Sequence, residues 1–499
     1  MRSRIITVNT GKQYFFFAQD TFKVTSRLTL SYGLRYEHYG APSNTGPAKD
    51  AVVQLGAGQD LAARLTTSQL VYPGSGDQRL YNADSKDWAP RFGFSYDLSG
   101  NAHTLVRGSY GLFYDRPYDN LWQILRINNF FEPTFSLSGS FNYLAPIPQK
   151  LKSLNSNYVD TSFPNLTLFD QNLKNARVQS YFFGLQQRLT ANYSLEVNTL
   201  GSLGRHLLVT DIVNRPNSDG LSRFNDNLSD IAYRSGQGSS DYNALTAVAR
   251  YRSGHKQFQI SYSWSHTIDN QSEPLVGDFE FLFARVGPDS TRSNFATFSR
   301  QFDSRGDRGN SDFDQRQNLV FLSIWDLPAP FAGSKVGRLF RDWKFSQLAA
   351  FRSGYPYSVR EPIDFDVNAP VVYSGRADVI DPKNAVLSSP IAVRGGKLLL
   401  NTAAFAQSAP NVQGNTGRNA FSGPGFYNVD ISLSRSFPLR WLGEGGRLMF
   451  RADAFNFLNH ANLGNPQPFF SPRMVKIFEA TDSVEFALTD VHTESAVVN

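Results

Sequence analysis

The sequence predicts an all-β fold, an antiparallel transmembrane β-barrel with long extracellular loops. Three observations support this prediction. Apolar and polar residues alternate along extended runs, these runs occur in pairs joined by short turns, and long polar segments separate the pairs. Strands of soluble proteins usually have about 5–6 residues, whereas these runs continue for about 9–11 residues, the length that a tilted strand needs to cross a bilayer. Short turns at one end of the strands and long loops at the other are typical of outer-membrane barrels.

The alternation is clearest in the stretch FYNVDISLSRSF, residues 426–437. Successive side chains of a strand point to opposite faces, so this stretch has one apolar face and one polar face. We expect the apolar face to contact lipid and the polar face to line a water-filled lumen. The apolar side chains are Tyr427, Val429, Ile431, Leu433 and Phe437, and the polar ones are Asn428, Asp430, Ser432, Ser434 and Ser436.

Six such pairs of alternating runs can be read along the chain, and the first four are joined by short turns. They cover residues 14–37, 91–115, 181–200, 244–266, 317–351 and 426–457, and the fifth alternates less regularly than the others. The intervening segments are rich in Gly, Pro, Asn and Ser and cover residues 40–88, 116–177, 205–241, 267–316 and 355–425. Loops of this length are rare inside compact soluble domains. With a further short run near the C-terminus, the pattern predicts about 12–14 strands.

Composition excludes several other classes of protein. The 499 residues are 41% hydrophobic with a mean hydropathy of −0.35, and no apolar run approaches the roughly 18 residues of a membrane helix. The absence of cysteine excludes disulfides, thiolate metal sites and cysteine nucleophiles. The net charge of +6 is dispersed, so no nucleic-acid partner is expected. A soluble β-sandwich or propeller is the alternative fold, although the irregular hairpin spacing argues against a propeller repeat.

Several segments together resemble a known family. In chain order they are QDTFKVTSRLTLSYGLRYE, APRFGFSYDL with VRGSYGLFYD, SYFFGLQQRL with LEVNTLGSLGRH, YNALTAVARYR with SYSWSHTIDN, RGNSDFDQRQNLVFLSIWDLP, GPGFYNVDISLSRSF and FRADAFNFLNHANLGNP. They are similar to barrel hairpins of TonB-dependent outer-membrane receptors of the Oar-like subgroup. The resemblance implies a plugged barrel of about 22 strands in the outer membrane of a Gram-negative-type cell. It also implies extracellular loops that bind a scarce substrate, and import driven through TonB acting on an N-terminal plug.

The two ends of the chain depart from this family pattern. We interpret residues 1–12 as a remnant of a preceding loop or strand, residues 13–488 as the C-terminal part of a receptor-like barrel, and residues 489–499 as a divergent tail. The start, MRSRIITVNTGKQYFFF, has no signal-peptide pattern. Asn499 is not the terminal aromatic that the barrel-assembly machinery reads in this family. We therefore expect a partial barrel that would contact the TonB system only through a missing N-terminal plug. We also expect that this part alone does not form a closed receptor, because unpaired backbone groups at an open strand edge are unfavourable in lipid.

No catalytic, cofactor-binding or metal residue is predicted, and the chain is not expected to be an enzyme. The acidic segment Asp303–Asp314 could bind Ca²⁺ through its carboxylates, but its spacing is not that of an EF-hand, and a solvated loop is the alternative. It contains the adhesion tripeptide Arg305-Gly306-Asp307, which is short enough to occur by chance. The histidines lack metal-ligand spacing; they are His38, His103, His206, His255, His266, His460 and His492.

Two groups of residues are candidates for contact with cargo or plug. Eight charges are expected to line the lumen: Arg35, Glu37, Arg107, Asp115, Arg188, Glu196, Arg451 and Asp453. The aromatic-rich segment Asn128–Leu144 is the best candidate for a ligand-contacting loop. The sequence therefore favours uptake of an unidentified substrate across the outer membrane. The alternatives are a TonB-independent porin or adhesin-like barrel, and an outer-membrane hydrolase.

Overall fold

The computed structural model describes residues 9–46, 49–71, 78–117, 166–215, 222–228, 230–272, 298–328, 341–360, 375–393, 396–409, 413–438 and 446–465. Two of the segments singled out above, residues 128–144 and 489–499, lie outside these ranges. Within the described ranges, no helix is both long enough and apolar enough to cross a membrane.

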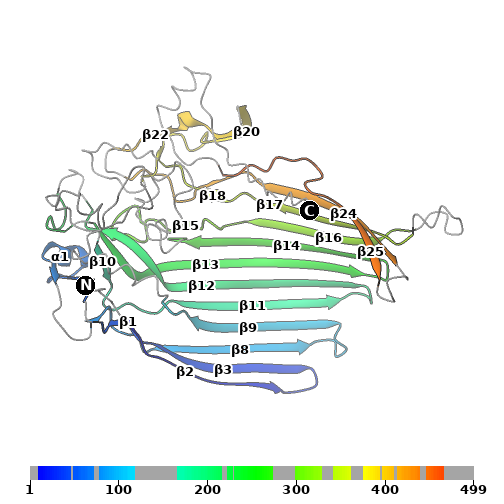
Figure 1. Ribbon diagram of the computed structural model, residues 1–499, viewed down its shortest axis with the longest axis horizontal. Coiled ribbons are helices and arrows are strands. Elements are labelled where there is room, and N and C mark those ends of the chain that lie inside the picture. The colour runs from blue at the N-terminus through cyan, green and yellow to red at the C-terminus, as the bar shows by residue number, and fades with distance from the viewer. Residues whose placement is uncertain are drawn as a thin grey trace, which may run out of the picture.

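One fourteen-stranded sheet dominates the structure, and its main strands follow one another in chain order (Figure 1). Along this path every neighbouring pair is antiparallel. The strands are β2 (Gln13–Lys23), β3 (Leu28–Tyr39), β8 (Asp87–Asp97), β9 (Thr104–Tyr114), β11 (Arg177–Arg188), β12 (Tyr193–Val213), β13 (Ile231–Arg252), β14 (Lys256–Asp269), β16 (Gln317–Asp326), β17 (Trp343–Arg352), β24 (Phe426–Pro438) and β25 (Arg447–Ala454). Two short strands lie off the path: β10 (Leu166–Phe169) pairs in parallel with β13, and β15 (Gly309–Asn310) pairs with β14. The predicted antiparallel hairpins and strand number are confirmed.

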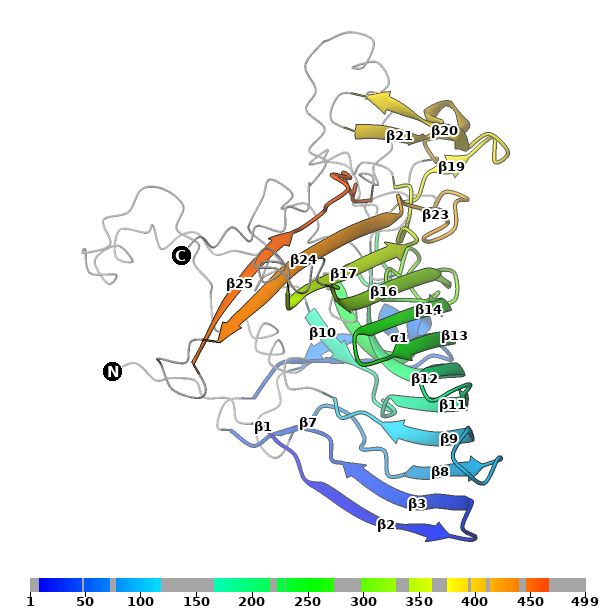
Figure 2. The same ribbon diagram turned by 90° about the vertical axis from the view of Figure 1, so that its right-hand side faces the viewer.

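The sheet curls into an arc that begins at β2 and ends at β25 (Figure 2). Among the described residues, no ladder of hydrogen bonds joins β2 to β25. The described strands therefore form part of a curved wall and not a closed ring.

Side-chain caps fix the short turns between paired strands. In the turn after β8, the Asp97 carboxylate accepts hydrogen bonds from the backbone N–H groups of Gly100 at 2.9 Å and Ala102 at 2.8 Å. Both residues have positive φ, of 75° and 60°, so these bonds hold the reversal in a conformation that glycine favours and that is unusual for alanine. In the turn after β11, Thr190 Oγ1 accepts a hydrogen bond from the Tyr193 N–H at 3.1 Å. Such local bonds allow each hairpin to form from nearby residues alone.

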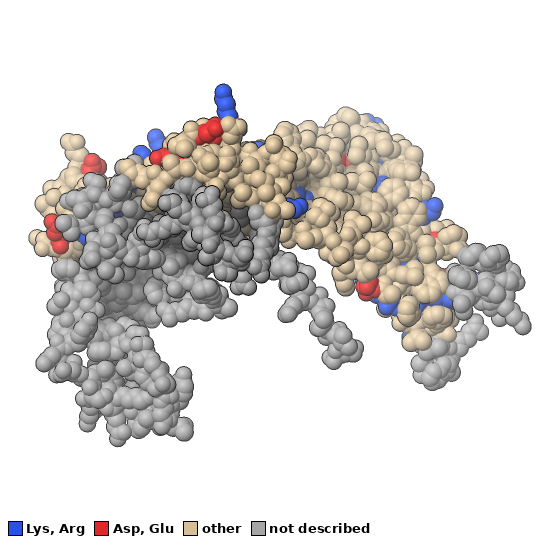
Figure 3. Space-filling view, turned by 90° about the horizontal axis from the view of Figure 1, so that it is seen from above, with Lys and Arg blue, Asp and Glu red and all other residues tan. Residues whose placement is uncertain are grey.

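The sheet has one apolar face and one polar face, as the alternation predicts. Cross-strand partners share a face: Val197, Ala247 and Tyr262 form one row, and the adjoining row of Asn198, Thr246 and Ser263 points the other way. The apolar face exposes many large side chains, among them Tyr32, Leu34, Phe92, Tyr110, Phe183, Leu245, Ile260, Trp264, Phe351, Tyr427 and Leu433. In the space-filling view, charged side chains are few and scattered over the described surface (Figure 3).

The apolar face of β24 carries one charge that the alternation did not indicate. Arg435 lies on this face between Leu433 and Phe437, close to the short-turn end of the strand. Its guanidinium lies over the rings of Trp343, at 5.9 Å, and Phe437, at 4.4 Å. Contact with the aromatic rings stabilises the guanidinium. Because Arg435 is close to the end of the strand, its side chain can also extend toward water.

The hairpin of β12 and β13 corrects the prediction that residues 205–241 form a loop. The two strands have 21 and 22 residues, and they continue to Val213 and from Ile231. At about 3.3 Å per residue, they are much longer than the crossing of a hydrocarbon core about 30 Å thick. Both Val213 and Ile231 are fully buried, so packing against other segments stabilises the extension. It was not predicted because the sequence between the two strands is polar.

Around this extension, the long connections pack into a structure that we call the cap. One of its cores contains Val53, Leu65, Leu166, Leu168, Val213, Leu228, Ile231 and Tyr233. A second core, with Tyr357, Val359, Ala377, Ala385, Ala404 and Phe405, belongs to the connection between β17 and β24. The small elements of the cap are β1 (Asn9–Thr10), β4 (Ser43–Asn44), β5 (Val52–Gln54), α1 (Leu61–Thr66), β6 (Gln69–Val71), β7 (Gln78–Arg79), β18 (Pro356–Tyr357), β19 (Asp378–Val379), β20 (Val386–Val393), β21 (Gly396–Leu400), the 3₁₀ helix Thr402–Ala404, β22 (Phe405–Ala406) and β23 (Phe421–Ser422).

Candidate functional site

Seven of the eight charges predicted to line a lumen lie on the polar face of their strands, and the eighth, Asp115, directly follows the end of β9. Their largest cluster centres on Glu196 of β12, which accepts hydrogen bonds from Arg107 of β9 and Arg250 of β13, both at 3.1 Å. Asn198 donates a further bond to Glu196 at 3.2 Å. Because β11 lies between β9 and β12, this cluster ties four neighbouring strands together.

Other charges on this face pair locally. Glu37 is 5% exposed, and it pairs with Arg35 and accepts a hydrogen bond from the Tyr39 hydroxyl at 3.0 Å. Near the other edge of the sheet, Arg451 donates to Asp453 at 2.9 Å within β25. These charges neutralise one another in separate pairs, so they form a polar wall and do not converge on one binding point.

The polar face also carries an apolar patch that the sequence did not reveal. Leu322 of β16 and Leu348 of β17 are cross-strand partners on this face and are 43% and 45% exposed. Val320, Ile324 and Ala350 surround them. We call these five residues the leucine patch. The irregular alternation of the fifth hairpin was the only signal for it, because β16 has apolar side chains on both faces.

In the cap, buried ion pairs join segments that are far apart in sequence. Arg215 donates to Asp211 at 2.9 Å, and the other Asp211 oxygen accepts the N–H of Phe302 at 2.8 Å. Burial raises the pKa of the Asp211 carboxyl to about 6 and lowers the pKa of the Arg215 guanidinium. Arg215 also donates to the carbonyl oxygens of Phe298 at 2.7 Å and Ser299 at 3.1 Å. These bonds fasten the segment after residue 297 to the tip of β12.

A second pair of ion bridges fastens the connection between β17 and β24. Asp307 pairs with Arg376, and their side chains are 3% and 11% exposed. Arg418 donates to Asp269 at the end of β14 at 2.5 Å. Removing one partner of a buried pair leaves an uncompensated charge, typically at about 3–5 kcal/mol. The cap is therefore cross-linked by charge as well as by its apolar cores.

The acidic segment at residues 303–314 uses its carboxylates separately. Asp307 pairs with Arg376, Asp312 accepts from Asn419, and Asp314 accepts from Arg316 at 2.7 Å. Asp303 accepts the N–H of Gly306 at 3.0 Å. Across the described ranges, no group of three or more His, Cys, Asp or Glu side chains could hold a metal ion. The carboxylates of this segment thus hold the loop in place through separate ion pairs and hydrogen bonds. The tripeptide Arg305-Gly306-Asp307 takes part through the Asp307–Arg376 pair and the Gly306 N–H.

Comparison with known proteins identifies the family. The sequence model of the outer membrane beta barrel domain matches residues 3–483. The chain belongs to this family. No match was found among curated proteins.

Solved outer-membrane proteins of similar structure were also found, at low identity. The transporter YddB from Escherichia coli is 12% identical with a TM-score of 0.42, and the match covers 92% of this chain and 52% of that one. The FrpB iron transporter from Neisseria meningitidis is 9% identical with a TM-score of 0.42, covering 94% and 44%. The siderophore receptor PiuA from Acinetobacter baumannii is 9% identical with a TM-score of 0.41, covering 91% and 40%. The chain thus spans about half or less of the length of these structures.

Membership of the outer-membrane barrel family orients the sheet. In a barrel of this family we expect the apolar face to contact lipid and the polar face to line the lumen. The structure places Tyr427 and Ile431 on the apolar face and Ser432 on the polar face, as the alternation predicts. The cap lies outside the cell, because long loops of these barrels are extracellular and short turns face the periplasm. Trp88, Tyr110 and Trp264 project from the apolar face near the cap end of their strands and are 54%, 45% and 55% exposed, as expected for an aromatic girdle.

Proposed function

We propose that this chain is the C-terminal part of the barrel of a TonB-dependent outer-membrane receptor, which takes up a substrate through a lumen occupied by a plug domain. The ordered sequence segments that resemble this family are its starting point. It assigns no catalytic step and leaves the substrate open.

The observation that carries the proposal is the leucine patch. A water-filled lumen is lined by polar side chains, yet Leu322 and Leu348 are nearly half exposed on the lumen side. Exposed apolar surface is unfavourable by about 25 cal/mol per Å². A folded plug against β16 and β17 would cover the patch, whereas a permanently open channel would leave it in water.

The cap supports a role in recognition. Its loops have cores of their own and are cross-linked through Asp211, Asp307 and Asp269. A pre-ordered binding surface loses less conformational entropy when a ligand docks. An adhesin-like barrel could use the same surface, so the cap alone does not distinguish the two functions.

The lumen can be tested directly because the chain contains no cysteine. We would introduce Leu322→Cys into the full-length protein and expose outer-membrane vesicles to a membrane-impermeant maleimide. We expect slow labelling of Leu322→Cys and no stable ion conductance of the protein in planar bilayers. Gln259→Cys, the cross-strand neighbour of Leu322 on the same face, maps the extent of the protected area.

Rapid labelling of both positions together with a steady conductance would instead identify a passive porin. Dependence on TonB is tested separately, by comparing the uptake of candidate substrates with and without a protonophore. Uptake that continues in de-energised cells would contradict the receptor proposal.

A further inference from the structure

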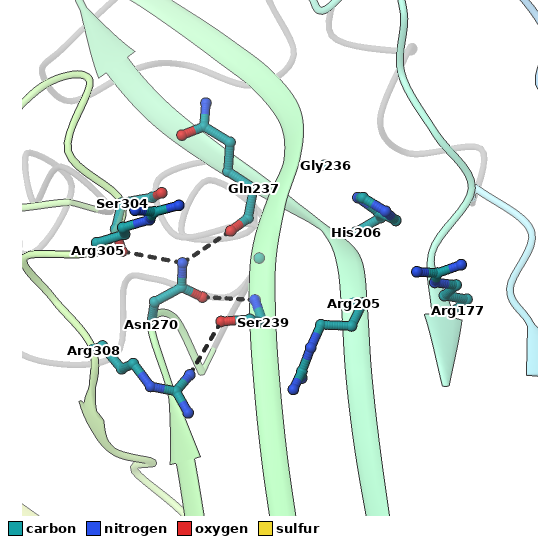
Figure 4. A pocket seen from close by; sticks show the side chains of 11 residues that line it. Arg177, Arg205, His206, Gly236, Gln237, Ser239, Asn270, Ser304, Arg305 and Arg308 are labelled. Atoms are coloured by element: carbon teal, nitrogen blue, oxygen red, sulfur yellow. Dashed lines mark hydrogen bonds between the residues drawn. The ribbon is translucent and has the colours of Figure 1, made fainter. Parts of the chain in front are cut away.

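A basic pocket lies where the barrel wall meets the cap (Figure 4). Its volume is about 460 Å³. Figure 4 shows Arg305 and Arg308 on one side of β13, and Arg205, His206 and Arg177 on the other. Four arginines and one histidine thus contribute to the lining, and no carboxylate does.

Two opposed β-bulges build this pocket. The register of β12 and β13 shifts between Arg205 and Leu207, and again between Leu207 and Val209. The first shift leaves His206 unpaired in β12 with a φ of 55°, in the left-handed region. The second leaves Gly236 and Gln237 unpaired in β13. Bulges redirect side chains and recur beside functional sites, and here they open a concavity in an otherwise continuous wall.

The rim of the pocket is held in place by an amide. Asn270 Nδ2 donates to the carbonyl oxygens of Gln237 at 3.0 Å and Ser304 at 3.1 Å, and Asn270 Oδ1 accepts the N–H of Ser239 at 2.8 Å. These three bonds join β14, β13 and the cap segment that carries Arg305 and Arg308. The arginines of that segment are therefore positioned by ordered backbone.

The pocket opens on the lipid side of the wall. Arg205 pairs with Ser239, and β13 pairs with β12 without further shifts from Ser239 to Tyr251. Strand alternation therefore places Arg205 and Ser239 on the face of Leu245, which contacts lipid. Arg177 lies on the same face of β11 as Tyr181, whose hydroxyl donates to Asn243 of β13. None of these positions faces the lumen.

Its height follows from the aromatic girdle, because Tyr181 is the cross-strand partner of the girdle residue Tyr110 and therefore lies near the edge of the hydrocarbon core. Arg177 lies four residues beyond Tyr181 along β11. Four residues span about 13 Å of strand, or about 10 Å along the membrane normal for a strand tilted about 40°. Polar headgroup layers begin at the edge of the hydrocarbon core and are about 5–7 Å thick in an ordinary bilayer. Glycolipid headgroups extend further, so the pocket lies beside them.

The pocket has unbalanced positive charge. Asp241, outside the lining, pairs with both Arg205, at 2.6 Å, and Arg308. Arg177 and Arg305 have no carboxylate partner among the described residues, and Arg177 Nε is buried without a hydrogen-bond acceptor there. Burial, and after it the nearby charges of Arg177 and Lys174, lower the pKa of His206.

We propose that this pocket binds a phosphate group on the headgroup of an anionic glycolipid in the outer leaflet. Arg177 and Arg305 would supply forked N–H donors to the phosphate oxygens, because guanidinium groups match phosphate geometry and form charge-assisted bonds. Arg205 and Arg308, held by Asp241, complete the positive wall. This lipid site is independent of what the barrel transports.

The test uses the full-length protein, purified from outer membranes in detergent and depleted of lipid. Native mass spectrometry would measure binding of diphosphoryl lipid A, dephosphorylated lipid A and inorganic phosphate. We expect the parent protein to prefer diphosphoryl lipid A. Charge-assisted bonds of this kind correspond to about tenfold or more in affinity each. The variant Arg177→Gln/Arg305→Gln removes two such groups and is therefore expected to lose about a hundredfold in affinity for diphosphoryl lipid A. Arg305→Lys should retain part of the binding.

The control is Arg300→Gln, which removes one positive charge from an exposed position of the same cap segment, outside the lining. It should bind lipid A like the parent protein, and an unchanged melting temperature of each variant would show that folding is intact. Equal affinity of the double variant and the control would overturn the proposal. Tight binding of inorganic phosphate that displaces lipid A would also overturn it, because the site would then serve a soluble anion.

Discussion

Replacing Ile431 by lysine tests whether the apolar face contacts lipid. Ile431 lies four residues from Tyr427 and six from Phe437 along β24, about 13 and 20 Å of strand. At a tilt of about 40°, the shorter path is about 10 Å along the membrane normal, so the charge cannot easily reach water by extending its stem. A lysine on the lipid face near the midplane lowers barrel stability by about 2–4 kcal/mol, or roughly 30–900-fold in the folding equilibrium. Because Gln347 is the cross-strand partner of Ile431 on this face, we expect the lower half of that range.

Ser432→Lys is the matched control, one residue away on the lumen face. Ser432 pairs with Asp453 across β24 and β25, so a lysine there gains a carboxylate neighbour and keeps contact with water. The measurement is urea unfolding of the full-length protein in phosphatidylcholine vesicles, followed by tryptophan fluorescence. Ile431→Lys should strongly lower the urea concentration at the unfolding midpoint, and Ser432→Lys should hardly change it. Equal destabilisation by the two substitutions would refute the assignment of the faces.

Three further outcomes are expected. Ala247→Cys, on the lipid face, should resist a membrane-impermeant maleimide but react with a lipid-soluble one, whereas Leu322→Cys should become reactive to the impermeant reagent once the lumen is emptied by denaturant. Asp307→Asn should loosen the cap by about 3–5 kcal/mol, because Arg376 is left buried without its counter-charge; limited proteolysis of intact cells would measure this loss. Folding raises the pKa of Asp211 from 3.8 to about 6. Between these pH values the folded cap therefore binds more protons than the unfolded cap. The contribution of Asp211 to the stability of the cap should increase as pH falls from about 7 to 4. Asp211→Asn should remove that dependence.

The controls for these outcomes come from the same structure. Asp312→Asn should leave the cap resistant to protease. The Asp312 side chain is 58% exposed and only 3.4 Å from Arg418, and an asparagine keeps an oxygen that can accept the hydrogen bond from Asn419. Cap cleavage as fast as in Asp307→Asn would contradict the role given to the buried pair. If protease resistance of the parent and Asp211→Asn proteins changed identically with pH, another group would be responsible for the dependence.

The barrel wall was predictable because its signal is local. Alternation with a period of two depends only on neighbouring residues, and the turn residues that end each run, such as Asp97 and Thr190, also act within a few positions. The predicted run at residues 28–37 and the observed strand Leu28–Tyr39 accordingly agree closely.

The cap and the basic pocket were not predictable, because their contacts join distant segments. The extension of β12 and β13 is stabilised by burial of Val213 and Ile231 against residues of other loops, and the sequence between them looks like an ordinary polar loop. Arg177 and Arg305 line the same pocket only because of the fold. The leucine patch left one trace, the irregular alternation of residues 317–327, which could have been interpreted as a strand with apolar surface on both sides.

Because the strands lie in the sheet in chain order, the barrel wall and the cap differ in how they can assemble. Each hairpin of the wall closes only a short loop, so the entropy lost on loop closure is small. Successive hairpins can therefore form one after another along the chain. The bonds of the cap span much longer separations, such as Arg215 to Phe298, 83 residues, and Asn225 to Leu65, 160 residues. Contacts of such separation form late. We therefore expect the cap to fold after the wall is in place. Under mildly denaturing conditions it should unfold and refold while the membrane-spanning strands remain folded.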